Sequence, residues 1–147
     1  MSIDALENEP TTRMLAELIY HRMLYETYRF TKFSLAENYK LTELKAKAVV
    51  RYIRRKIAPA QQVMIGYDYD LELYRVFRPD EFDIAIANGV REVLSIESYL
   101  KTVNASIFFP ALKNGKIDAG RYKKITDALT FIGKALAEFR KDADPSS

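Results

Sequence analysis

The chain has 147 residues, of which 48% are hydrophobic and 29% charged, and it carries a formal net charge of +3 at pH 7. This composition suits one globular domain with a substantial core, and the absence of cysteine excludes disulfides and thiolate chemistry. No apolar run reaches the roughly 18 residues of a membrane-spanning helix, and the acidic N-terminus contains no secretory signal, so we expect a protein of the cytoplasm or of a particle assembled there.

The first expected helix covers residues 12–30, with Thr11 or Thr12 as its N-terminal cap. A lone surface helix has one apolar stripe, whereas this helix has apolar or aromatic side chains almost all round. It is therefore either a central core helix or a helix partly buried by a neighbouring subunit. These side chains are Met14, Leu15, Leu18, Ile19, Tyr20, Met23, Leu24, Tyr25, Tyr28 and Phe30.

The second expected helix covers residues 35–58, where Ser34 and Glu37 match a capping box and Pro59 ends the helix. Its residues separate into two faces when they are placed about 100° apart around the axis. The apolar face consists of Leu35, Tyr39, Ala46, Val49, Val50, Ile53 and Ile57. A basic stripe lies nearly opposite and consists of Lys40, Lys47, Arg51, Arg54 and Arg55.

Residues 59–68 resemble a connector around Pro59 and Gly66. The next segment, Tyr67 to Phe77, alternates polar and apolar residues, which is typical of a short strand, although a helical turn capped by an aspartate also fits. Because no partner strand is evident elsewhere in the chain, we favour the helix.

The longest expected helix covers residues 80–109, from Pro79 in its first turn to Pro110, which ends it. An Asn-Gly turn then leads to a last helix over residues 118–141, capped by Asp118. Both helices keep heptad spacing, through Phe82, Ile86, Val93, Ile96, Leu100, Val103 and Ile107 in the first and through Tyr122, Ile125, Leu129, Ile132, Leu136 and Phe139 in the second.

Two heptad helices joined by a short loop pack as an antiparallel αα-hairpin, and we expect Gly89 at a close approach between them. The fold class predicted for the chain is therefore an all-α helical bundle, in which this hairpin joins the two N-terminal helices. We expect one domain over residues 1–147, with short polar termini at 1–10 and 142–147.

Signatures of catalysis are missing from the sequence, which has no phosphate-binding glycine loop and no nucleophile elbow. His21 is the only histidine and has no cysteine to pair with. The spacing of Asp68, Asp70 and Glu72 offers carboxylates to a divalent cation, but a solvated acidic edge explains it better. We therefore expect no catalytic residue, no metal and no cofactor.

Charge is segregated along the chain, with a basic block at 40–56, an acidic block at 68–97 and a second basic block at 101–124. The basic stripe spaces its cations about one helical turn apart, which suits the phosphates of a DNA or RNA backbone without reading of the bases. The other interpretations are a solvated helix face and a face that binds an acidic protein.

A small helical chain with a basic face is analogous, in shape and charge alone, to helical coat proteins that wrap viral genomes. We therefore expect a non-enzymatic structural subunit, coat-like or architectural, that contacts nucleic-acid backbone and forms homo- or hetero-oligomers through apolar helix faces. The alternative is an adaptor or small subunit of a larger complex that binds an acidic partner.

Overall fold

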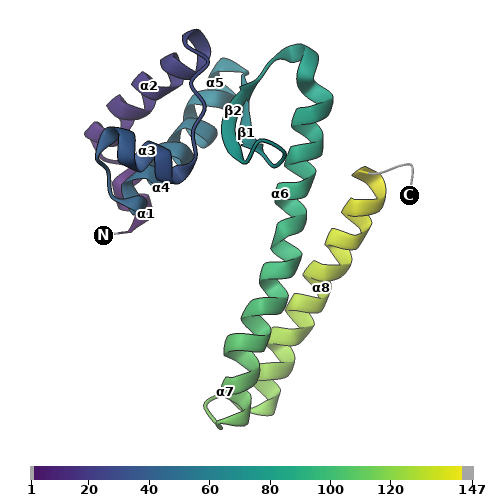
Figure 1. Ribbon diagram of the computed structural model, residues 1–147. Helices are drawn as coiled ribbons and strands as arrows, with labels where there is room; N and C mark the ends of the chain where they lie inside the picture. The colour runs from purple at the N-terminus through teal and green to yellow at the C-terminus, as the bar shows by residue number, and fades with distance from the viewer. Residues whose placement is uncertain (1, 144–147) are drawn as a thin grey trace. The chain divides into compact units, whose positions relative to one another are not determined.

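The computed structural model describes residues 2–143. The chain divides into two compact units, Met1–Gly89 and Val90–Ser147, called unit 1 and unit 2 below. The protein is mostly helical, with 76% helix and 8% strand, so the predicted helical character is confirmed (Figure 1). The expectation of a single domain stays a prediction. None of the described helices is both long and apolar enough to cross a membrane.

Unit 1 starts with two helices, α1 (Ile3–Glu7) and α2 (Pro10–Tyr25). The Ser2 side chain accepts a hydrogen bond from the Ala5 N–H at 3.2 Å, so the polar N-terminal lead contains a capped helix. The helix expected at 12–30 corresponds to α2. It begins at Pro10, because proline suits the first turn, and it ends at Tyr25. Thr27 has a left-handed backbone (φ 53°), and beyond it the chain forms a β-bridge between Phe30 and Tyr74.

The helix expected at 35–58 is broken into several elements, which corrects the prediction. Lys40 has a left-handed backbone (φ 53°), and its N–H donates to the carbonyls of the preceding turn. Thr42 then caps a new helix by accepting a hydrogen bond from the Lys45 N–H at 3.1 Å. The elements are α3 (Lys32–Tyr39), α4 (Glu43–Tyr52), the π-helical turn η1 (Ile53–Ile57) and α5 (Ala58–Gln61).

The capping box expected at Ser34 and Glu37 also lies elsewhere. Thr31 is the N-cap of α3, and its hydroxyl accepts a hydrogen bond from the Ser34 N–H at 3.0 Å. The Ser34 hydroxyl accepts one in return from the Thr31 N–H at 2.9 Å. The N-cap therefore lies three residues before the expected one, and Lys32 is in the first turn of the helix.

The preference for a helix at Tyr67 to Phe77 is wrong, because this region belongs to a β-hairpin. Strand β1 (Met64–Asp68) pairs antiparallel with β2 (Leu73–Phe77), and Gly66 lies opposite Arg75 in the register. The partner strand lies within the segment expected to be a connector. In the turn, the Asp68 carboxylate accepts hydrogen bonds from the N–H groups of Asp70 and Leu71, both at 3.0 Å.

The core of unit 1 lies where α2 packs against α4, with Phe30, Leu35 and Tyr74 at its edge. One face of α2 is buried in it, namely Ala16, Ile19, Tyr20 and Met23. The opposite face of the same helix exposes Met14, Leu18 and Tyr25. The core interpretation of this helix is therefore correct for one face, while cover by a neighbouring subunit stays a prediction for the other.

Between Pro79 and Ala143 the chain is helical apart from the turn between α7 and α8. It contains the 3₁₀ turn η2 (Pro79–Glu81), α6 (Phe82–Val103), the π-helical turn η3 (Asn104–Phe108), α7 (Phe109–Lys113) and α8 (Ala119–Ala143). The division between the two units falls within α6. Of the polar tail expected at 142–147, α8 includes the first two residues, and the rest lies outside the described part of the chain.

Pro110 does not end the helix, as the sequence had indicated, but lies in the first turn of α7. In η3 the Phe109 N–H donates to the Asn104 carbonyl five residues earlier, where an α-helix would use the fourth. The wider turn accommodates a ring that clashes with the carbonyl four residues before it. The same arrangement precedes Pro59, where the Ala58 N–H donates to the Ile53 carbonyl across η1.

Two local signals in unit 2 are confirmed. The Asp118 carboxylate accepts a hydrogen bond from the Arg121 N–H at 2.7 Å and caps α8. Gly115 has φ +68° in the turn between α7 and α8, a conformation that favours glycine.

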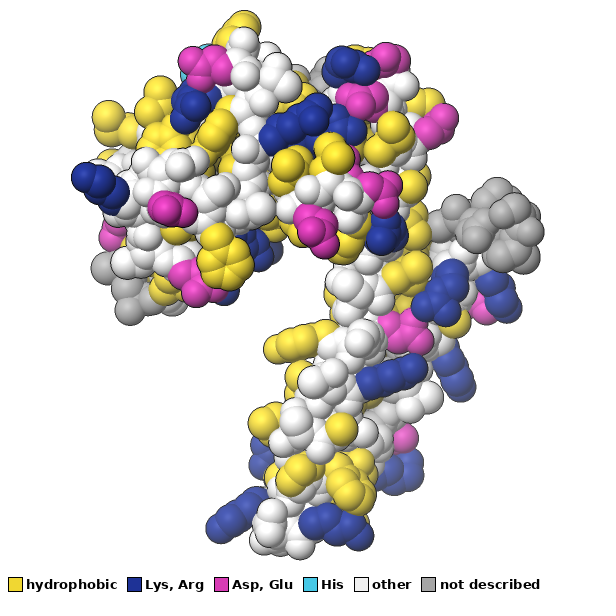
Figure 2. All heavy atoms as spheres, viewed as in Figure 1, with side chains coloured by type: hydrophobic (Ala, Val, Ile, Leu, Met, Phe, Trp, Pro, Cys, Tyr) yellow, Lys and Arg dark blue, Asp and Glu magenta, His cyan; other side chains and the backbone are white. Residues whose placement is uncertain are grey.

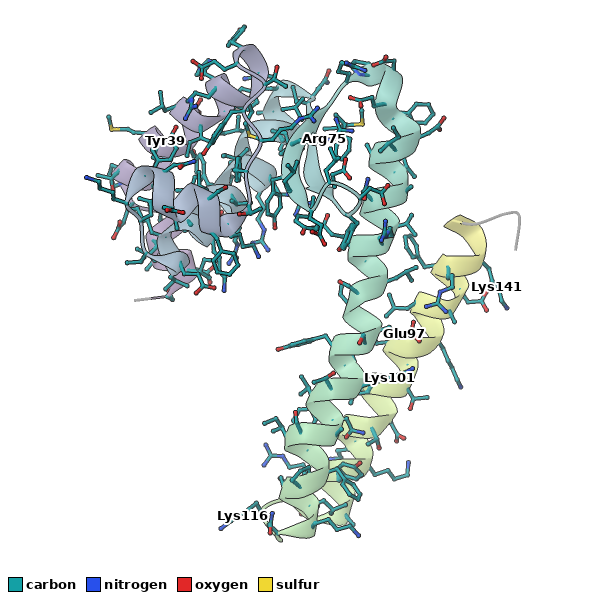
Figure 3. The ribbon with its side chains drawn as sticks, viewed as in Figure 1. Tyr39, Arg75, Glu97, Lys101, Lys116 and Lys141 are labelled. Carbon is teal, nitrogen blue, oxygen red and sulfur yellow. The ribbon has the colours of Figure 1, made fainter. Side chains whose placement is uncertain are left out.

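Side chains of α6 and η3 contact side chains of α8 within unit 2. Glu97 pairs with Arg140 at 2.7 Å, and the Tyr122 hydroxyl bonds to the Asn104 side chain at 3.3 Å (Figure 3 labels Glu97). As the residue number rises from α6 into η3, the number of the partner on α8 falls. How closely the two helices pack as a hairpin stays a prediction.

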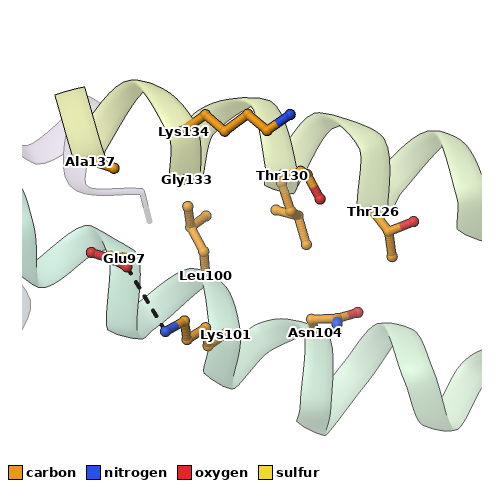
Figure 4. Close-up of a pocket in the computed structure, with 10 residues that line it drawn as sticks. Glu97, Leu100, Lys101, Asn104, Thr126, Thr130, Gly133, Lys134 and Ala137 are labelled. Atoms are coloured by element: carbon orange, nitrogen blue, oxygen red, sulfur yellow. Dashed lines mark ion pairs between the residues drawn. The ribbon is translucent and has the colours of Figure 1, made fainter.

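Packing in unit 2 leaves open space between these helices. A groove of about 420 Å³ runs between them, with Leu100 and Gly133 on its opposite sides (Figure 4). Among residues 90–141 no side chain is fully buried. The close approach expected at Gly89 is wrong, since a Cβ there would have no atom of the described chain within 4 Å beyond its own helix backbone, and Gly133 is equally open.

We predict that Gly133→Ala raises the free energy of unfolding by about 1 kcal/mol, because alanine is the better helix former and the added methyl meets open space. Gly115→Ala is the matched control and should lower it by about 1 kcal/mol, because φ +68° is unfavourable for alanine. Urea unfolding followed by circular dichroism measures both. A loss of stability in Gly133→Ala would mean that the helices approach each other more closely there.

Candidate functional site

Four of the five residues of the predicted basic stripe line one cavity of about 450 Å³ in unit 1, namely Lys47, Arg51, Arg54 and Arg55. Lys32 from the first turn of α3 joins them. We call these five side chains the basic pocket. Its remaining lining is apolar or aromatic and consists of Ile3, Val50, Ile65 and Tyr74.

Lys40 does not belong to the basic pocket. It lies in the left-handed C-cap of α3, outside α4, because the helix predicted to carry the whole stripe is interrupted there. Lys32 was missed for a related reason. It precedes the expected helix, and only the packing of α3 against α4 brings it to the cavity.

The direction of the basic side chains follows from the burial of α4 and η1. Ala46, Val49 and Ile53 are at most 1% exposed and fix the rotation of this segment against the core. Lys47, Arg51 and Arg54 follow one another at one-turn spacing on another side of the segment. The side chains that line the basic pocket therefore cannot turn into the core without unpacking α4.

Carboxylates of neighbouring segments partly neutralise one end of the basic pocket. Arg51 pairs with Asp4 at 2.7 Å and with Glu7 at 3.0 Å, both on α1. Lys47 pairs with Glu43 one turn earlier on α4 at 3.4 Å. The other two arginines of the basic pocket, Arg54 and Arg55, belong to η1.

The Arg54 side chain is fixed against the β-hairpin. Its Nε donates a hydrogen bond to the Ile65 carbonyl at 3.3 Å, and its guanidinium carbon lies 5.9 Å from the centre of the Tyr74 ring. Arg55 and the neighbouring Lys56 are exposed. The backbone hydrogen bond fixes the direction of the Arg54 guanidinium, and guanidinium groups suit an anionic ligand such as a phosphate.

A second charged cluster in unit 1 surrounds Arg75, which points from β2 toward the start of α6 (Figure 3). Its Nε lies 2.8 Å from the Asp68 carboxylate, and its two Nη atoms bond to the two Glu81 oxygens at 2.9 and 3.3 Å. Asn88 of α6 accepts a hydrogen bond from the Tyr69 N–H at 3.0 Å and attaches the turn of the hairpin to the helix.

The solvated acidic edge expected at Asp68, Asp70 and Glu72 is therefore only partly correct. Asp70 and Glu72 are exposed, but Asp68 is 3% exposed and ion-paired with Arg75. Within residues 2–143 no group of three or more histidine, cysteine or acidic residues is arranged to hold a metal ion. His21 lies exposed on α2 and stacks on the Tyr25 ring, far along the chain from any of these acids.

Both carboxylates of the Arg75 cluster are held in the charged form. The hydrogen bonds from Arg75 and from the Arg78 N–H lower the pKa of Glu81 to about 2. Burial alone would raise the pKa of Asp68, but hydrogen bonds from the Leu71 N–H, Arg75 and the Asp70 N–H outweigh it and lower the pKa. A fully paired cluster of this kind binds the hairpin to α6 and offers no reactive group to a substrate.

Comparison with known proteins finds no matching family model, and no curated protein or solved structure that matches the chain. The basic pocket is therefore the candidate functional site on its geometry and charge.

We predict that Arg75→Leu lowers the free energy of unfolding by about 3–5 kcal/mol, because it leaves the buried Asp68 carboxylate without its cation and removes one cation from the half-buried Glu81 carboxylate. Arg78→Ala is the control, since the Arg78 side chain is 71% exposed and its removal should cost at most about 1 kcal/mol. Chemical unfolding of the three proteins tests the contrast. Similar small losses in both variants would show that the Arg75 cluster contributes little to folding.

We further predict that the stability contributed by Glu81 is complete above its ordinary pKa of 4.5 and is lost as the pH falls toward the folded value of about 2. The lowered pKa means that the unfolded chain takes up the proton first, so acid favours unfolding. Urea midpoints measured between these pH values should fall further in the wild type than in Glu81→Gln, which has no carboxylate to protonate there. Parallel pH profiles would contradict this role of the ion pair.

Proposed function

We propose that the protein is a non-enzymatic structural subunit that binds the sugar-phosphate backbone of DNA or RNA at the basic pocket of unit 1. The observation that carries the proposal is the convergence of five cationic side chains from α3, α4 and η1 on one cavity. Helix periodicity alone explains a basic stripe, but it does not explain a lysine from a separate helix beside it. We place this function in the cytoplasm or in a particle assembled there.

The lining of the basic pocket favours binding of phosphate over reading of bases. Arginine forms paired hydrogen bonds with phosphate oxygens, and three arginines line the cavity. Arginine and lysine can also read guanine, but asparagine and glutamine, which read adenine, are not in the lining. Backbone contact without sequence specificity is the mode that these residues support.

The π-helical turn η1 adds a structural argument. Such turns are less favourable than α-helix and occur often at functional sites. This one carries Arg54 and Arg55 and is followed directly by α5, which has Pro59 in its first turn. The turn sets the direction of both guanidinium groups relative to Lys47 and Arg51 on α4, so the basic pocket depends on it.

We also propose that α6 and α8 of unit 2 form the antiparallel αα-hairpin expected from their heptads and serve as an assembly arm. The pairs Glu97–Arg140 and Asn104–Tyr122 support this arrangement. A hairpin that leaves all of its described side chains at least partly exposed needs further helices to complete a core.

A second candidate function is that of an adaptor whose basic pocket binds an acidic protein segment. The contacts of α1 favour it, because Asp4 and Glu7 already bind Arg51 with carboxylates from a helix. An acidic helix of a partner would extend the same chemistry toward Arg54 and Arg55. The two candidates differ in the ligand but share the basic pocket.

The test is a fluorescence-anisotropy titration of duplex DNA at several salt concentrations. Each phosphate that the protein neutralises contributes about −0.9 to the slope of log affinity against log salt, so three or four contacts give a slope near −3. The double variant Lys32→Ala/Arg55→Ala should lower the magnitude of this slope by about 2, equally for unrelated DNA sequences. Both side chains line the basic pocket and neither lies in the core.

The matched control is Lys40→Ala/Lys56→Ala, which removes the same charge from exposed residues outside the basic pocket. Its slope should stay close to that of the wild type. Equal slopes in both double variants, or no binding at low salt, would reject the nucleic-acid proposal. Binding of an acidic peptide that only the pocket variant loses would then put the adaptor function first.

A further inference from the structure

Two helices of unit 1 are joined by a turn of three residues. α3 ends at Tyr39 and α4 begins at Glu43, and the left-handed Lys40 lies in the turn between them. α3 packs against α4, and α2 packs against the same helix in the core. A turn of three or four residues between two packed helices is typical of the helix-turn-helix unit, whose second helix enters the major groove of duplex DNA. In this arrangement α4 is the helix that would face the groove.

The β-hairpin attaches both ends of this pair of helices. Phe30 lies just before α3 and exchanges two backbone hydrogen bonds with Tyr74 of β2, at 3.2 and 2.7 Å. At the other end, the hydrogen bond from Arg54 to the Ile65 carbonyl attaches η1, which continues α4, to β1. The two helices are therefore held in one orientation, as docking to a rigid duplex requires.

The side of α4 that points away from the core is not open to solvent. When residues are placed about 100° apart, the core residues of α4 lie on one side, and Leu44, Ala48 and Arg51 lie nearly opposite. Leu44 is 38% exposed, as expected of an outward position. Ala48, by contrast, is 0% exposed although it does not belong to the hydrophobic core around α2. Another segment of the chain therefore covers this side of α4.

The covering segment is α1, which packs against α4 and lies beside it in Figure 1. Arg51 follows Ala48 by about one turn on the same side, and the carboxylates of Asp4 and Glu7 pair with it at 2.7 and 3.0 Å. Glu7 is itself buried. Figure 2 shows acidic and basic side chains close together in the region of α1. α1 thus places negative charge on the side of α4 that would contact DNA.

The contact with α1 does not satisfy Arg51 completely. The Nε atom of Arg51 is buried and makes no hydrogen bond to any described residue, although the Glu7 carboxylate lies 3.0 Å away. Carboxylates and phosphates bind guanidinium groups through the same kind of paired hydrogen bonds. The acids of α1 therefore hold Arg51 by charge, in the place that a phosphate would take, without completing its hydrogen bonds.

We propose that α3 and α4 form a helix-turn-helix unit for duplex DNA, and that α1 is an acidic cover that must leave α4 before the helix enters the major groove. The proposal rests on the proposed function of unit 1 and adds the form of the nucleic acid and a means of regulation. While α1 is in place, it keeps Arg51 neutralised and lines one part of the basic pocket with Ile3.

Displacement of α1 is feasible because the helix is short. It has five residues, and an isolated helix of that length is not stable in water, so α1 depends on its contact with α4. Phosphates of the duplex replace the two carboxylates at Arg51, so the cation stays paired when α1 leaves. Removal of the cover also exposes Ala48, a small side chain that lets α4 approach the base pairs closely.

The double variant Asp4→Asn/Glu7→Gln tests the cover, because it removes both carboxylates with little change in shape. Its affinity for duplex DNA should exceed that of the wild type by about tenfold at low salt, since the wild type must first break two ion pairs with Arg51. Single-stranded DNA of the same length offers no major groove, so its affinity should rise much less. Fluorescence anisotropy measures both ligands.

The matched control is Glu17→Gln/Glu138→Gln, which removes the same charge from exposed residues of α2 and α8. If this control raises duplex affinity as much as the α1 variant, the effect is one of net charge and the cover is overturned. An equal gain for single strands overturns docking in the groove. If neither wild type nor variant binds DNA at low salt, the proposed function itself fails, and this proposal fails with it.

Hydrogen exchange of the wild type gives a second measurement that needs no variant. The N–H groups of Leu6 and Asn8 donate to the carbonyls of Ser2 and Asp4 within and beside α1. Both should exchange faster when the protein is saturated with duplex DNA, while the N–H of Tyr122 in α8 serves as the unchanged reference. Unchanged or slower exchange at Leu6 and Asn8 in the complex would show that α1 stays in place and would overturn the proposal.

Discussion

The burial of α4 against α2 is the constraint on which the candidate site depends. Ala46 and Val49 are fully inaccessible, and small side chains at these positions let the two helices approach closely. Since this contact fixes the rotation of α4, the lysine and arginine side chains of the same helix have no choice of direction. The packing of the core thus determines where the charged side chains of the basic pocket point, although the core side chains themselves are uncharged.

The two prolines that follow π-helical turns show how the chain keeps its helical path without ideal geometry. Pro59 and Pro110 would each clash with a carbonyl four residues earlier, and one wider turn before each proline relieves the clash. In unit 1 the wider turn contains Arg54 and Arg55, so the same local adjustment places part of the basic pocket. In unit 2 it joins α6 to α7, just before the turn that leads to α8.

Unit 1 uses charge in two different ways. The Arg75 cation is matched by the buried Asp68 and the half-buried Glu81 carboxylates, so the cluster attaches the β-hairpin to α6 and leaves no charge for a ligand. In the basic pocket the acids of α1 and α4 pair with Arg51 and Lys47, and five cationic side chains line one cavity. Unit 2 differs from unit 1 in its apolar residues. Its helices carry apolar stripes, but no side chain among residues 90–141 is fully buried.

The sequence alone determined the features that depend on neighbours a few residues away. It predicted the helical character, the cap at Asp118, the turn at Gly115 and most of the basic stripe, because helix periodicity and capping are local interactions. Only the tertiary structure decided that 64–68 pairs with 73–77, that Lys40 ends a helix and that Lys32 joins the basic pocket. These outcomes depend on packing between separate segments, such as α3 against α4. A strand or a break in a helix is stabilised by contact with another segment, and the periodicity of one segment does not reveal that contact.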